Sequence, residues 1–267
     1  MESPVDTNLK KNFVSIRIHP SEPTEQQHEI INSLARELRN PVTILKSNIQ
    51  LLKKFCIKTE DLFIHDSFFL CECAVNDILR FINCLGFLSD SYHGVLKSKK
   101  TRFDLNLFLK QGLEEIKSLN FDLSRIHLRL KVQNLFIVTD KNLLQKIVFN
   151  LVINALKFSY LAVDLIITES NQRLNIVVRD YGIGIPPTEL KEVFKPFVRG
   201  GNANMIPGAG LGLSTISRAI MCLGGTLDVK SIPGKETEFN VTIPLESFPG
   251  SKTRPRRAIS LNRNRSY

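Results

Sequence analysis

No uninterrupted apolar run in this 267-residue sequence approaches the ~18–20 residues that a membrane-spanning helix needs. Residues 1–12 lack an apolar stretch and a small-residue cleavage site, so we do not expect a secretory leader. The five cysteines form an odd, irregular set. Neither a second cysteine pair nor a neighbouring histidine completes a metal site around Cys71 and Cys73. These absences predict a cytoplasmic protein with reduced thiols and no integral membrane segment.

Acidic residues are missing from the C-terminal tail, residues 248–267. After Gly250, lysine and arginine contribute six of the formal +10 charges, which leaves about four for the rest of the chain. A basic run of this kind could contact nucleic acid or anionic lipid. A disordered, solvated tail is the favoured interpretation, and the body of the chain gives no strong argument for a polyanionic partner.

A long helical pattern follows an irregular N-terminus over residues 1–24. Apolar residues recur every three, four or seven positions over residues 25–52, and Pro41 is expected to bend this helix. A second seam runs through residues 68–85 with gaps of three and four. Because a lone hairpin cannot bury both seams, residues 25–92 predict a homodimeric four-helix bundle. The alternative is a monomer whose hairpin packs on its own second domain.

Strand and helix patterns alternate beyond a linker over residues 93–101. Residues 141–158 have the apolar period of a helix, and residues 182–207 form a long loop with several glycines and prolines. Two final strands are expected to form a hairpin around Gly234. The fold class predicted for residues 102–247 is α+β, a mixed sheet covered by helices in an α/β sandwich.

The predicted helix of this second domain carries polar side chains on one face. Asn150 and Asn154 are four residues apart, so they share a helix face. Amide oxygens are suitable ligands for a hard Mg²⁺ ion that bridges phosphates, and Lys157 adds a compact positive charge nearby. Two asparagines on a helix would mean little without the segments that follow.

The next two segments have residues that could surround a ligand. Asp180 ends a strand, and Gly182 and Gly184 allow the backbone to turn close to a bound molecule. The carboxylate of Asp180 could accept a hydrogen bond from an exocyclic amine such as that of adenine. Phe197 and Arg199 lie in the long loop, where the aromatic ring would provide apolar closure.

A fourth segment opens a helix with Gly208, Gly210, Leu211 and Gly212. Glycines expose backbone donors to a phosphate there, and the helix N-terminus adds the positive end of its dipole. In this order and spacing, the four segments resemble the nucleotide-binding boxes of the GHKL ATPase superfamily, in its histidine-kinase branch. The resemblance extends over residues 103–245.

This resemblance implies a site for ATP and Mg²⁺. By it, Asn154 would coordinate Mg²⁺, Asp180 would read adenine, Lys157 would approach phosphate, and the glycines of the fourth segment would form the hinge of a lid. The gyrase, chaperone and mismatch-repair relatives carry a glutamate at the position of Asn150. An asparagine cannot act as a base, so nucleotide binding or phosphoryl transfer fits better than a hydrolysis motor.

The first helix resembles the phosphoacceptor motif His-Glu-Leu-Arg-(Thr/Asn)-Pro at every position except the histidine, where Arg36 stands. A guanidinium stays protonated and has no free lone pair, so Arg36 cannot be the usual nucleophile. It could attract a phosphoryl group as a clamp or be a solvated remnant. His28 imitates the motif but lies about 12 Å away along the axis. Glu37 and Asn40 imply a retained phosphatase or docking function.

Together these residues predict a histidine-kinase-like signalling protein that binds ATP and Mg²⁺ and engages a response regulator or another histidine kinase. Autophosphorylation at the usual site is not expected. Two alternatives stay open. One is an active kinase that uses another acceptor or phosphorylates in trans, and the other is a non-enzymatic scaffold that heterodimerises with another kinase. No sensor domain is expected, because only about 24 residues precede the hairpin.

Overall fold

The structure is a computed structural model. The residues that it describes are 14–17, 38–39, 42–54, 62–92, 98–203, 206 and 209–246. Arg36, Glu37, Asn40, Gly208 and the basic tail over residues 248–267 lie outside these ranges.

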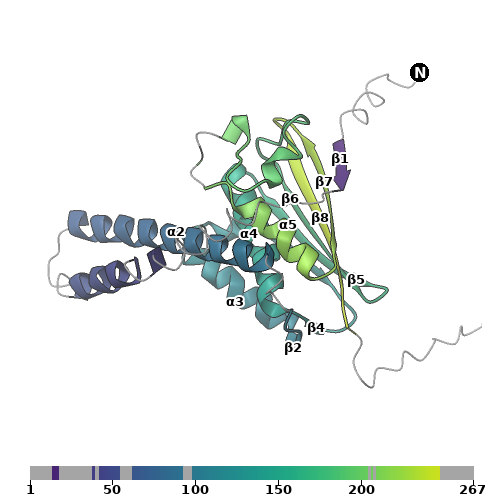
Figure 1. Cartoon of the computed structure of the whole chain (residues 1–267), viewed down its shortest axis with the longest axis horizontal. Coiled ribbons are helices and arrows are strands. Elements are labelled where there is room, and N and C mark those ends of the chain that lie inside the picture. Colours follow the sequence, from purple (N-terminus) through teal and green to yellow (C-terminus); the bar gives the residue numbers. More distant parts are fainter. Residues whose placement is uncertain are drawn as a thin grey trace, which may run out of the picture.

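The helical hairpin consists of a helix over residues 42–54 and the long helix α2, Leu62–Tyr92. The spacing of their apolar residues creates one shared seam, in which Val42 and Ile49 pack with Val75 and Ile82. Figure 1 shows the hairpin extending away from the rest of the molecule, while the C-terminal half of α2 lies against it. The predicted bend at Pro41 lies outside the described residues.

The second domain is built on a mixed sheet. Within the described residues the larger sheet has six strands in the order β1-β7-β8-β6-β5-β3, and β3 with β5 is its parallel pair. Its strands are β1 (Val14–Arg17), β3 (Ile126–Lys131), β5 (Val163–Ser170), β6 (Arg173–Asp180), β7 (Thr226–Ile232) and β8 (Glu236–Pro244). A two-stranded sheet joins β2 (Thr101–Asp104) to β4 (Phe136–Thr139). The predicted α+β class is confirmed.

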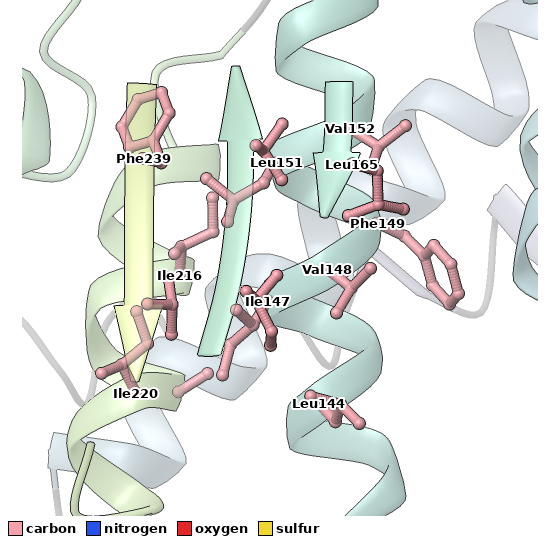
Figure 2. Close-up of a cluster of buried hydrophobic side chains, with 14 of the residues drawn as sticks. Leu144, Ile147, Val148, Phe149, Leu151, Val152, Leu165, Ile216, Ile220 and Phe239 are labelled. Carbon is pink, nitrogen blue, oxygen red and sulfur yellow. The ribbon is translucent and has the colours of Figure 1, made fainter. Parts of the chain in front are cut away.

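Three helices cover one face of the larger sheet, namely α3 (Leu105–Lys117), α4 (Lys141–Phe158) and α5 (Gly212–Cys222). Strands β5 and β6 alternate between buried and half-buried residues, so every second side chain faces these helices. Figure 2 shows Ile147 and Leu151 of α4 meeting Ile216 of α5, with Phe239 of β8 beside them. This core fixes α4, β6 and the start of α5 around one end of the sheet.

Strand β1 corrects the expectation of an irregular N-terminus over residues 1–24. It pairs antiparallel with β7, and Val14 lies opposite Ser231. The segment before the hairpin therefore belongs in part to the sheet of the second domain. A four-residue strand whose partner is more than 200 residues away along the chain leaves little local signal, because its pairing is entirely non-local.

Candidate functional site

A cavity of about 510 Å³ opens between α4, the end of β6, the start of α5 and the helix α2. Most of the residues that the sequence predicted for nucleotide binding line it. They are Asn150, Asn154, Lys157, Asp180, Gly184, Arg199, Gly210, Leu211 and Gly212. Gly182 and Phe197 do not line the cavity, and Gly208 lies outside the described residues. Segments far apart in the sequence thus converge on one concave site.

Asp180 lies at the sheet end of the cavity, where β6 stops. Its side chain is almost completely buried, with 4% of the residue exposed, and it accepts a hydrogen bond from the backbone N–H of Gly182 at 3.1 Å. Burial raises the pKa of this carboxyl to about 7, the Gly182 hydrogen bond opposes that shift, and the charge of Glu236 adds to it. An added hydrogen-bond donor would stabilise the ionised form.

Thr237 is a cavity residue that the sequence reasoning missed. It lies directly opposite Asp180 in the register of β6 with β8, is buried, and lines the same cavity. Its hydroxyl lies 3.0 Å from that of Ser231, which accepts a hydrogen bond from the Ile185 N–H at 2.8 Å. The predicted hairpin around Gly234 pairs Thr237 with Ser231 only, and the pairing of Thr237 with Asp180 is a non-local one between β8 and β6 that the sequence did not signal.

The glycines after Asp180 allow close approach to the protein backbone. A Cβ on Gly182 would lie 2.0 Å from the carbonyl oxygen of Phe158, at the end of α4. Gly184 has φ +63°, and a Cβ there would lie 2.3 Å from the carbonyl oxygen of Ile232. The sequence predicted that the backbone at Gly182 passes close to a ligand. In the structure the close neighbour of Gly182 is the protein's own backbone at Phe158. These contacts bring the loop across the end of α4 and shape the cavity wall.

The two asparagines of α4 have different surroundings. The Asn150 side-chain amide donates to the backbone oxygen of Lys146 at 2.8 Å, one turn earlier in the helix. Asn154 lies against the start of α5, where a Cβ on Gly212 would be 3.4 Å from the amide nitrogen and oxygen of Asn154. Asn154 is therefore next to a helix N-terminus, the part of the cavity that favours an anion.

Phe197 and Arg199 organise the loop that leads to α5. Phe197 has φ +67°, and its N–H donates to the carbonyl oxygen of Gly210 at 3.0 Å. The Phe197 ring lies 6.5 Å, centroid to centroid, from that of Phe81 on α2. Arg199 lines the cavity, but its Nη2 donates to the carbonyl oxygens of Ala203, at 2.6 Å, and Ile206. Both residues thus hold the loop in shape.

The hairpin also contributes to the cavity, which the sequence reasoning did not anticipate. Arg80, Phe81 and Cys84 of α2 line it together with the residues of the second domain. The heptad seam of α2 suggested only helix packing, because periodicity does not reveal which face of a helix meets a separate domain. Among the described residues, no cluster of three histidine, cysteine or acidic side chains could hold a metal ion.

Comparison with known proteins shows what this part of the chain is similar to. Residues 139–247 match the family model for the histidine kinase-, DNA gyrase B-, and HSP90-like ATPase. The sensor histidine kinase AtsR of Burkholderia thailandensis is 36% identical over 135 residues, which cover 48% of this chain and 22% of the relative. The signal transduction histidine-protein kinase/phosphatase MprB of Mycobacterium leprae is 28% identical over 242 residues, which cover 86% of this chain and 46% of the relative.

A solved structure shares the fold across both parts of the chain. A crystal structure of full-length ShkA in complex with AMPPNP has a TM-score of 0.63 and 22% identity, and covers 82% of this chain and 46% of that one. The fold and the site define a GHKL-type ATP-binding domain. Over most of its length the chain is similar to a two-component histidine kinase, and residues 139–247 match the ATPase family model. It spans about half or less of the length of the curated relatives described above. Within the described residues, no helix is long and apolar enough to cross a membrane.

Proposed function

We propose that the protein is a signalling member of the two-component histidine kinase family that binds ATP with Mg²⁺ and does not autophosphorylate at position 36. The observation that carries the proposal is the cavity in which Asp180, Asn154 and the start of α5 meet. Its two ends differ in character. A buried carboxyl lies at the sheet end, and a helix N-terminus lies at the other, which suits a ligand with a hydrogen-bonding base and an anionic tail.

The sheet end of the cavity fits adenine. A buried carboxyl with a pKa near 7 lacks solvation for its charged form, and an exocyclic amine would supply the missing hydrogen bond. Thr237 is buried, lies opposite Asp180 in the strand register and lines the same cavity. Asp180 would therefore read the base, with Thr237 as a second polar group that fixes its orientation.

The opposite end fits magnesium and phosphates. Because the described residues contain no acidic cluster there, Mg²⁺ would depend on the amide oxygen of Asn154 together with the phosphates themselves. Asn150 and Lys157 line the same wall. When bound, the ion would neutralise phosphate charge. Asn150 cannot deprotonate a water molecule, so we do not expect an efficient ATPase.

The acceptor position decides the enzymatic question. Arg36 cannot attack phosphorus, because its guanidinium has no free lone pair at cellular pH. Glu37 and Asn40 keep the residue types that the family motif has at these positions. We infer that they provide a docking surface for a response regulator or assist its dephosphorylation. Incubation with a phosphorylated response regulator, in which loss of its phosphoryl group is measured, would test the second role. An unchanged rate of dephosphorylation with the Glu37→Gln variant would refute that role.

The partner that we propose for the hairpin is a second copy of the chain. Several large apolar side chains on its helices are exposed within one protomer, including Ile44 at 61% and Leu52 at 54%. A homodimeric bundle over residues 25–92 would cover them, with the ATP-binding domain over residues 102–247 attached to it. Heterodimerisation with another histidine kinase is the alternative. We place the assembly in the cytoplasm, where response regulators would be accessible.

Replacement of the arginine tests the proposed lack of autophosphorylation. The wild type and the Arg36→His and Arg36→Gln variants are incubated with γ-labelled ATP and Mg²⁺, and acid-labile label on the protein is measured. We expect label on Arg36→His alone, because imidazole restores a nucleophile. Arg36→Gln controls for loss of the positive charge. Acid-labile label on the wild type would contradict the proposal and favour an active kinase with another acceptor.

A further inference from the structure

One face of α2 runs along the ATP-binding domain. Arg80, Cys84, Phe87 and Ser91 follow one another at steps of four, three and four residues, so they lie on the same side of the helix. Phe87 is buried in the core of the ATP-binding domain, and Ser91 is buried as well. Arg80 and Cys84 line the cavity. The stripe thus continues from a packed contact at the C-terminal end of α2 into the candidate nucleotide site.

The packed end of this stripe is held by specific contacts. Arg218 of α5 donates from Nε to the Ser91 hydroxyl at 3.0 Å and from Nη2 to the Ser91 backbone oxygen at 2.6 Å. The arginine itself is only 9% exposed. Lys146 of α4 places its Nζ 4.7 Å from the centroid of the Phe87 ring. These contacts fix the rotation of α2 about its own axis and direct Arg80 toward the cavity.

The hairpin reaches the cavity at the end that favours anions. Leu211 is buried in the core of the hairpin, where it packs with Ile82 and Leu85 of α2. The next residue, Gly212, begins α5, so the N-terminus of α5 lies against α2. Asn154 adjoins the same point. Arg80 lies two residues before Ile82 on α2 and lines the same cavity, in which the helix dipole of α5 attracts negative charge.

We propose that Arg80 binds the phosphates of the nucleotide, so that the hairpin helix supplies one side of the site. This inference rests on the proposed function and adds a residue from outside the ATP-binding domain. A guanidinium matches phosphate oxygens with paired hydrogen bonds. Because the contact exists only while α2 is docked, bound ATP stabilises the docked arrangement, and docking in turn raises the affinity for ATP. Nucleotide occupancy is thereby transmitted to the helices that face the partner.

The test compares ligands with and without phosphates on the full-length chain. Binding of ATP and of adenosine is measured by calorimetry, each with Mg²⁺, for the wild type and for Arg80→Gln, Arg80→Lys and Arg173→Gln. We expect Arg80→Gln to weaken ATP binding about 10-fold or more and to leave adenosine binding unchanged. Arg80→Lys keeps the positive charge and should therefore lose less ATP affinity than Arg80→Gln. Arg173 is exposed at the far end of β6 from Asp180, so Arg173→Gln should behave like the wild type.

Each other outcome is decisive. Unchanged ATP affinity in Arg80→Gln would overturn the inference and leave the proposed function intact. Equal loss for ATP and adenosine would mean that Arg80 only packs in the cavity wall, which also overturns it. Absence of nucleotide binding in the wild type would instead refute the proposed function, and the inference with it.

Discussion

At the scale of single residues, Asp180 is the group whose chemistry most depends on its surroundings. Without ligand its burial is unfavourable for the charged form, which is why its pKa rises from 3.8 to about 7. A protein retains such a carboxyl at a stability cost, and the cavity beside it supplies a reason. A ligand donor that pairs with the carboxylate would offset that cost.

The cost of Asp180 predicts a pH-dependent difference in stability. Near pH 4 the carboxyl is largely protonated in the folded state, so its burial lowers the free energy of unfolding only a little. As the pH rises toward 8, the unfolded chain ionises first, so the folded state loses relative stability until the pH passes about 7. Relative to the wild type, Asp180→Asn should gain roughly 2–4 kcal/mol of unfolding free energy between pH 4 and pH 8.

Urea unfolding at the two pH values measures this gain. Asp90→Asn, at an exposed position of α2, is the control for removal of a carboxyl that is not buried. A stability difference between Asp180→Asn and the wild type that stays constant from pH 4 to pH 8 would mean that the carboxyl titrates normally, and would remove this support for its role.

At the scale of elements, different faces of the hairpin have different surroundings. One stripe of α2 docks on the ATP-binding domain, while other apolar residues of the hairpin remain exposed in a single protomer. Lys46 of the first helix bonds Asn76 of α2 at 2.9 Å, which fixes how the two helices lie together. The alternative of a hairpin that packs on its own second domain thus describes part of α2 and leaves the exposed apolar residues unexplained.

Replacement of Leu52 tests the dimer at this scale. A buried glutamate without a partner is costly, so Leu52→Glu should shift the chain from dimer to monomer in light scattering. Leu128, an exposed leucine on the edge strand β3, provides the matched control, and Leu128→Glu should stay dimeric. A wild type that is monomeric at all concentrations would contradict the proposed homodimer.

The sequence allowed the elements with strong periodicity to be predicted and left out those that depend on long-range pairing. The α+β class and α4 followed from local patterns, since amphipathic spacing is a local property. Asn154 and Asp180 were found through family resemblance. Thr237 required the register of two strands, and Arg80 required the docking of one domain on another. Neither relation leaves a trace in the residues nearby.

At the scale of the whole molecule, the structure joins a helical hairpin to a GHKL-type domain through a cavity that both line. Under the proposed function, position 36 has no nucleophile, and nucleotide binding is then the event that changes the arrangement of the two parts. In such a molecule ATP would act as a ligand that favours one arrangement, which requires a difference in affinity between the docked and undocked states.

Nucleotide affinity of the full chain is therefore the measurement that tests the account most directly. Titration with ATP, in the presence of Mg²⁺ and again with a chelator, should give magnesium-dependent binding by the wild type. Asp180→Asn should bind at least about 10-fold more weakly, because the base loses a charged hydrogen-bond partner. Absence of magnesium-dependent affinity for adenine nucleotides in the folded wild type would contradict the account.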